Sequence, residues 1–319
     1  MDFSAVDRYV QTLLADVPLS GAALVVSRGE QVVYEHGYGM FTPDTRLPVA
    51  SVSKWVSAAV IAALIDNNTL HLDERVSDYL WSFGGDKETI LLRQLLAHTS
   101  GLPWGEARCI RDATATLAAC ADAIAELPLE APPGTQFAYG ENSYQVGGRM
   151  AEVASGTAWH DLFMNRLATP LGMTATDYAS HVSSEGIVPV TNPRISSGLR
   201  STARDLARFT RMMACGGLGV LRSETIAQMF EDQTFGAPVA FSPNLLSGVG
   251  YGLGVWRERV DAHGWAIQVS SPGAYGTTPW VDVSLRLGGV FVCQNAYARM
   301  AAPVQQVQNL VRAAIVAGA

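Results

Sequence analysis

A serine and a lysine stand three residues apart in the stretch Ser51-Val52-Ser53-Lys54-Trp55, just before an apolar run, VSAAVIAALI, that predicts a helix. On a helix this spacing puts the Lys54 amine on the same face as the Ser51 hydroxyl. Of the 22 basic residues in the chain, only Lys54 and Lys87 are lysine. Arginine stays protonated, whereas a lysine at a helix N-terminus, where the dipole and burial disfavour its ammonium form, can take the proton of a serine nucleophile. We therefore predict that Ser51 and Lys54 are catalytic, with a plain helix-capping serine as the alternative.

Four further stretches follow in a characteristic order: LLRQLLAHTSGLPW at 91–104, PLGMTATDY at 170–178, GLRSTARDLARF at 198–209 and GYGLGVW at 250–256. Together with the Ser-x-x-Lys motif, they resemble the serine β-lactamase-like family, which includes class C β-lactamases, DD-peptidases and family VIII esterases. The resemblance runs from about residue 20 to about residue 295. It implies an α+β fold: an antiparallel β-sheet flanked by N- and C-terminal helices, with an inserted, mainly helical domain. It also implies an acyl-enzyme mechanism without a cofactor.

The resemblance assigns a role to Tyr139. The stretch PGTQFAYGENSYQVGGR at 133–149 matches the spacing of the family's Tyr-x-Asn motif, whose tyrosine acts as a base together with the lysine. Tyr139 is therefore expected to carry protons to and from Ser51, with a buried core tyrosine as the alternative. Glu141 stands where the family has asparagine, and its carboxylate either pairs with Lys54 or lies in solvent.

A third motif, usually Lys-Thr-Gly or His-x-Gly, is replaced by Ser271-Pro272-Gly273. By resemblance, the backbone N–H of Ala274 would join that of Ser51 in an oxyanion hole, and Gly273 would let the substrate come close. Pro272 lacks a strand donor, which predicts an edge position.

The change in the third motif bears on the substrate. Without its lysine or histidine, the site lacks the usual cation that meets the carboxylate of penicillins and cell-wall peptides, and an unpaired buried carboxylate binds poorly. We therefore expect weak or no β-lactamase activity and a preference for small neutral carboxylic esters. The predicted substrate-binding residues are Glu141, Ser271, Gly273, Tyr275 and Trp104, and Trp280 is a further candidate for an acyl pocket.

Other readings of the same residues stay open. A D-amino-acid amidase or peptidase, or an acyltransferase, would use the same chemistry, and a catalytically silent homologue would only hold a ligand. No Gly-x-Ser-x-Gly elbow is found in the sequence, which argues against an α/β-hydrolase triad. His98 is expected to be structural, and neither Ser53 nor Ser100 has a lysine three residues later.

The elements that must position these residues come from both ends of the chain. Residues 3–15 predict a helix, a hairpin turns at Arg28-Gly29-Glu30, and three strands followed by a helix close the chain after residue 264. We predict a discontinuous sheet domain of residues 1–54 and 241–319, and a mainly helical domain of residues 55–240. The site is expected at their junction, where clefts for small molecules form readily.

Composition and charge exclude several classes of binding partner. A net charge of −7 and a pI near 5.4 give no basic surface for nucleic acid, and no apolar run approaches the ~18 residues that a membrane span needs. Asp2 and Asp7 stand where a secretory signal would carry basic residues, which favours the cytoplasm. The four cysteines form no C-x-x-C pair and no cluster with histidine, so we expect reduced thiols and no metal site. The expected partner is a small-molecule ester or amide, and the oligomeric state stays open.

Overall fold

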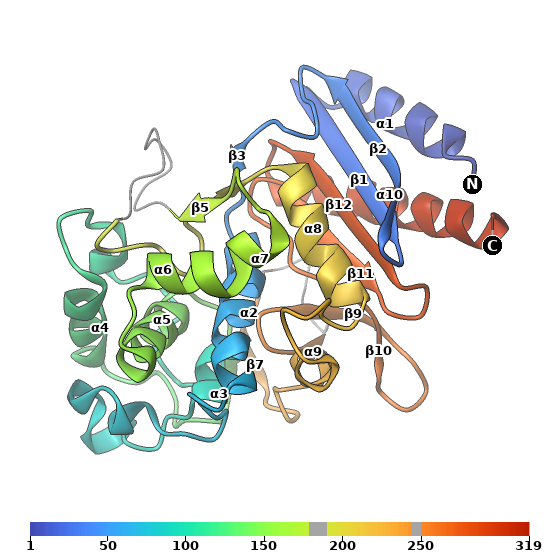
Figure 1. The fold of residues 1–319 in the computed structure, drawn as a ribbon. Coiled ribbons are helices and arrows are strands. Elements are labelled where there is room, and N and C mark those ends of the chain that lie inside the picture. The colour runs from blue at the N-terminus through green and yellow to red at the C-terminus, as the bar shows by residue number, and fades with distance from the viewer. Residues whose placement is uncertain (179–189, 244–249, 319) are drawn as a thin grey trace.

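The computed structural model describes residues 1–178, 190–243 and 250–318 (Figure 1). Its main sheet has seven strands in the order β2-β1-β12-β11-β10-β9-β8, and the neighbouring strands are antiparallel. The strands are β1 (Gly21–Arg28), β2 (Gln31–Gly39), β8 (Gly250–Tyr251), β9 (Trp256–Val260), β10 (Ala266–Ser270), β11 (Thr278–Asp282) and β12 (Leu287–Cys293). Because β1 pairs with β12, the two ends of the chain meet in one sheet, as predicted.

Helices cover both faces of this sheet (Figure 1). Strand β1 is apolar at consecutive positions because it is buried on both sides: Leu24 and Val26 face α1 (Ser4–Asp16) and α10 (Tyr297–Ala317), while Ala23 and Val25 face the opposite core. Helix α8 (Ala203–Ala214) packs on that opposite face, against β1, β11 and β12. This helix lies within the segment that we predicted as a helical domain, yet its apolar side, which includes Phe209, completes the sheet layer.

The remaining helices surround α2 (Val52–Asp66). Every residue of α2 from Val52 to Ile65 is buried, which explains why its sequence is apolar all round rather than on one stripe. The other helices are α3 (Leu92–Leu96), α4 (Leu117–Ala125), α5 (Asn142–Ser155), α6 (Trp159–Phe163), α7 (Thr169–Leu171) and α9 (Ser223–Phe230), with 3-10 turns η1 (Val76–Asp78), η2 (Trp81–Phe83), η3 (Gly85–Lys87) and η4 (Arg108–Arg111) and the π-helical turn η5 (Met164–Ala168). Ser51 and Lys54 therefore start a helix enclosed between the sheet and the helical part of the molecule.

Short strands form smaller sheets outside the main sheet. Strands β3 (Leu47–Pro48), β6 (Leu199–Ser201) and β5 (Asp177–Tyr178) form a small antiparallel sheet, and β4 (Phe137–Ala138) runs parallel to β7 (Val239–Phe241). The glycine-rich stretch 247–256 leads into β8 and β9, although its first three residues lie outside the described residues. Pro272 corrects a prediction: it follows β10, which pairs with β9 and β11 and is therefore an interior strand. The missing N–H is tolerated because the strand has already ended.

The cysteines give a second correction. Cys109 in η4 and Cys120 in α4 form a disulfide across a Cα–Cα distance of 5.1 Å, whereas we expected reduced thiols. The spacing of 11 residues matches no short motif, so only the packing of η4 beside α4 brings the two sulfurs together. Cys215 and Cys293 are free.

No helix in the described part of the chain is long and apolar enough to cross a membrane. No group of three or more His, Cys, Asp or Glu side chains in that part of the chain is arranged to hold a metal ion.

Candidate active site

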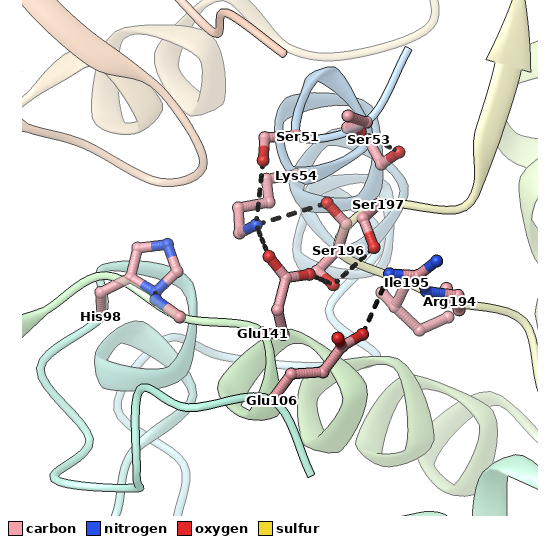
Figure 2. Close-up of polar contacts among 12 residues, drawn as sticks. Ser51, Ser53, Lys54, His98, Glu106, Glu141, Arg194, Ile195, Ser196 and Ser197 are labelled. Atoms are coloured by element: carbon pink, nitrogen blue, oxygen red, sulfur yellow. Dashed lines mark hydrogen bonds and ion pairs between the residues drawn. The ribbon is translucent and has the colours of Figure 1, made fainter. Parts of the chain in front are cut away.

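Ser51 immediately precedes α2 and is partly exposed, whereas Lys54 is completely buried. Among the described residues, the Ser51 Oγ has one hydrogen-bond partner, Lys54 Nζ, at the long distance of 3.5 Å (Figure 2). Ser51 occupies the N-cap position of α2, as the alternative assignment requires, but its side chain makes no capping hydrogen bond. Ala50, just before it, has a φ of 47°, in the left-handed region that non-glycine residues adopt mainly where the surroundings enforce it.

The neighbouring hydroxyls are engaged in the scaffold. Ser53 Oγ donates to the Ala50 carbonyl at 2.6 Å and accepts from the Leu199 N–H at 3.0 Å. Ser100 Oγ shares a hydrogen bond with Ser143 Oγ at 2.9 Å. Ser51 is thus the hydroxyl of this group that faces the lysine.

Lys54 contacts a carboxylate. Its Nζ lies 3.0 Å from Glu141 Oε1 and 3.4 Å from the Ser196 carbonyl oxygen, and 4.6 Å from the centre of the Tyr139 ring. The second oxygen of Glu141 accepts a hydrogen bond from Ser196 Oγ (Figure 2). Of the two alternatives for Glu141, pairing with Lys54 is the one observed. Ser196 belongs to a segment that our reading of the sequence did not single out.

This pairing reverses the charge state that we expected for the lysine. Burial by itself would lower the pKa of Lys54, but the charge of Glu141, the contribution of Tyr139 and the hydrogen bonds outweigh it, and the pKa is raised. Burial would likewise raise the pKa of Glu141, yet the Lys54 charge and the bond from Ser196 leave it lowered. The resting site therefore holds an ammonium and a carboxylate. The sequence could not show this because Glu141 is 87 residues from Lys54.

Tyr139 is held by aromatic packing. It is 9% exposed, stacks on Trp256 with ring centres 5.3 Å apart and lies 4.5 Å from the His98 ring. Its N–H donates to the Phe241 carbonyl at 3.0 Å, and the next N–H, of Gly140, donates to His98 Nδ1 at 3.3 Å. Burial holds the pKa of His98 well below its usual range, and the charge of Lys54 adds to this. His98 is a neutral support for the loop that carries Tyr139, as predicted.

The third motif lies beside Ser51. Ser271 Oγ donates to the Ser51 carbonyl at 3.2 Å. A Cβ on Gly273 would lie 2.1 Å from the Val49 carbonyl oxygen. The glycine is therefore required for close packing against the residues at the start of α2, and its role in admitting the substrate stays a prediction.

The two predicted oxyanion donors are available. Within the described residues, neither the Ser51 N–H nor the Ala274 N–H meets an acceptor. The carbonyl of Ala274 accepts from the Tyr297 N–H at 2.9 Å, which fixes this peptide at the start of α10. Both N–H groups are thus without a protein acceptor in the described part of the chain, as an oxyanion hole requires, and that role stays a prediction.

Exposed aromatic rings stand near these groups. Trp104 is 43% exposed and stacks on Phe241 with ring centres 4.0 Å apart, and Gly140 packs against the backbone of Trp104. Tyr275, two residues after Gly273, is 40% exposed. Trp280 is buried in the core under α1 and α10, on the other face of the sheet, so its candidacy for an acyl pocket is wrong. Phe241 was missed because its signal is only a two-residue pairing of β4 with β7.

A second carboxylate lies nearby. Glu106 pairs with Arg194 at 2.9 Å and with Arg111 at 2.5 Å (Figure 2 shows the Arg194 contact). Arg194 and Arg111 both interact electrostatically with Glu141. We predicted no role for Glu106, Arg111 or Arg194, because no motif marks them in the sequence.

Comparisons with known proteins agree with this arrangement. The family model described as Beta-lactamase matches residues 6–311. Penicillin-binding protein 4 of Amycolatopsis lactamdurans is 33% identical over 227 residues, which cover 62% of this chain but only 60% of that relative. A β-lactamase-like protein from Bacteroides dorei is 37% identical with a TM-score of 0.81, and the match covers 92% of this chain and 90% of that one.

EstCE1, described as a hydrolase with promiscuous acyltransferase activity, shares the fold with a TM-score of 0.77 over 96% of this chain and 97% of its own, at 20% identity. The family match over nearly the whole chain, the mixed fold and the Ser-x-x-Lys pair lead to one conclusion: the chain belongs to the Beta-lactamase family of serine hydrolases and has the α+β fold of that family.

Proposed function

We propose that the protein hydrolyses small neutral carboxylic esters through an acyl-enzyme on Ser51. The observation that carries this proposal is the contact between a partly exposed serine hydroxyl and a buried, ion-paired lysine, 3.5 Å apart. Hydrogen bonds at such sites are often long without substrate and tighten when it binds. Ser51 attacks the carbonyl carbon, Lys54 and Tyr139 handle its proton, and water then releases the acid.

The tetrahedral oxyanion would lie between the N–H groups of Ser51 and Ala274. Such donors commonly contribute about 2.7 to 4 kcal/mol to transition-state stabilisation. Ser271 positions the strand end by its bond to the Ser51 carbonyl. The rings of Trp104, Phe241 and Tyr275 would contact an apolar acyl or alcohol group.

Charge favours a neutral substrate. The third motif brings no cation, and the two arginines that interact electrostatically with Glu141 are engaged by Glu106. A substrate carboxylate would meet the Glu141 anion without a dedicated partner. We therefore propose esters rather than β-lactams, with a small molecule as the partner. The cytoplasmic location remains a prediction, and the disulfide weighs against it because such bonds are typical of oxidising compartments.

The test uses a fluorophosphonate probe and intact-mass measurement. The wild type should gain the mass of one adduct and Ser51→Ala should gain none. A protein that only holds a ligand would stay unlabelled under conditions that label a control serine hydrolase. With labelling established, a short p-nitrophenyl ester should be hydrolysed faster than a chromogenic cephalosporin, and Ser51→Ala should lower ester hydrolysis by at least about a thousandfold. Faster turnover of the cephalosporin would refute the ester proposal.

A further inference from the structure

We propose that Ser51, Lys54 and Glu141 form a proton relay in which Glu141, rather than Lys54, finally accepts the proton of the nucleophile. This inference rests on the proposed function, because it concerns how Ser51 is activated. It assigns to Glu141, which we predicted only as a substrate-binding residue, a positioning and proton-accepting role exerted through Lys54.

Three polar contacts of Lys54 determine where its protons can go. Lys54 Nζ has acceptors at 3.5 Å (Ser51 Oγ), 3.0 Å (Glu141 Oε1) and 3.4 Å (Ser196 carbonyl). An ammonium has three N–H donors and no lone pair. It can therefore take the Ser51 proton only while it gives another proton away. Of the other two acceptors, a carboxylate becomes a stable acid on protonation and a backbone carbonyl does not, so the proton goes to Glu141.

Hydrogen bonds hold both oxygens of the Glu141 carboxylate in place. One oxygen faces Lys54, and the other accepts from Ser196 Oγ, whose own carbonyl also contacts Lys54. The Glu141 side chain is 21% exposed, so a proton on it can pass to solvent. The ionisable groups facing this pair are Tyr139, Tyr144, Tyr251, His98, Arg194 and Arg111, and both arginines are bound by Glu106.

Acylation of Ser51 moves one proton along this relay. Ser51 Oγ forms a bond to the ester carbonyl carbon, and the π electron pair moves to the carbonyl oxygen. The Ser51 proton passes to Lys54 Nζ as a different proton passes from Nζ to Glu141 Oε1. When the intermediate collapses, the bond to the leaving alcohol breaks, and the proton held by Glu141 returns through Lys54 to that oxygen, with Tyr139 beside the path. Water repeats the sequence to release the acid.

The experiment measures the rate of fluorophosphonate labelling against pH, which needs no knowledge of the natural substrate. In that reaction the Ser51 oxygen bonds to phosphorus, fluoride leaves, and the serine proton must be removed. The variants are Glu141→Gln, which removes the acceptor at nearly constant shape, and Glu141→Asp, which keeps a carboxylate. Glu152→Gln is the matched control, since Glu152 on α5 is a carboxylate that pairs with Arg149 and, among the described residues, contacts neither Lys54 nor Glu141.

The variants should differ in how the labelling rate depends on pH as well as in the rate itself. Glu141→Gln should label at least about a hundredfold more slowly at pH 7, because general base assistance typically contributes 10² to 10⁴. Its rate should then climb as pH rises, because burial without the Glu141 charge lets Lys54 lose its proton and act as the base. Glu141→Asp should regain part of the rate with the wild-type profile, and Glu152→Gln should keep both rate and profile.

Two outcomes would overturn the relay alone. In one, the labelling rate of Glu141→Gln stays within about threefold of the wild-type rate, or it falls while its dependence on pH stays that of the wild type. In the other, Tyr139→Phe and not Glu141→Gln changes the profile, which would make Tyr139 the acceptor. Thermal melting checks that each variant is folded. If Glu141→Gln is not folded, the labelling rate and pH profile of Glu141→Asp decide between the outcomes. Failure of the wild type to label at all would instead remove the proposed function.

Discussion

Replacing Gly273 by alanine tests how closely the third motif must pack against the nucleophile. The added Cβ would lie 2.1 Å from the Val49 carbonyl oxygen and 3.4 Å from a methyl of Val52, whereas real Cβ contacts essentially never fall below 3.0 Å. The obstacle is backbone, so the turn at 271–277 has to move by about 1 Å away from α2. The N–H of Ala274 would move with it. A 1 Å misplacement of a catalytic group commonly costs about a hundredfold in rate, and overpacking costs about 1 to 3 kcal/mol in stability.

We therefore expect Gly273→Ala to lower ester hydrolysis by about a hundredfold while the protein still folds. The assay pairs the rate of p-nitrophenyl ester hydrolysis with urea unfolding. Gly105→Ala is the control, because a Cβ there meets nothing within 4 Å and should change neither quantity much. If Gly273→Ala kept its activity within about threefold and its stability within about 0.5 kcal/mol, the contact with Val49 would not set the position of the oxyanion donor.

Three further predictions concern stability. Replacing Cys109 and Cys120 by alanine should lower the free energy of unfolding by about 3 kcal/mol, the chain-entropy value for so short a loop, and urea unfolding with and without reductant measures it. Asp177→Ala should cost about 3 kcal/mol in urea unfolding because it removes a buried carboxylate that pairs with Arg46 and Arg200. His98 has a pKa well below its usual range when folded, so the unfolded chain takes up a proton that the native protein does not. Stability should therefore fall as pH drops below about 6.5, by up to about 1.4 kcal/mol per pH unit, and melts across pH 5 to 8 should lose that component in His98→Gln.

Sequence patterns predicted the elements that depend on residues close together in the chain. The helix at the N-terminus, the hairpin at Arg28-Gly29-Glu30 and the three strands after residue 264 follow from periodicity and turn residues, and all are present. The contact of Ser51 with Lys54 follows from helical spacing alone. Helix α8 also formed as its sequence suggests. The sequence did not predict that α8 packs on the main sheet, because an amphipathic face does not say which surface will cover it.

The sequence by itself determined the family and the contact between Ser51 and Lys54, the proposed nucleophile and its lysine, because these depend on residue type and on short spacings. Tertiary structure decided the electrostatics around them. Glu141 meets Lys54 across 87 residues and Ser196 meets Glu141 across 55, and Cys109 finds Cys120 only when η4 packs beside α4. The protonation state of a buried lysine depends on which charges share its low-dielectric surroundings, and that is settled only when distant segments come together.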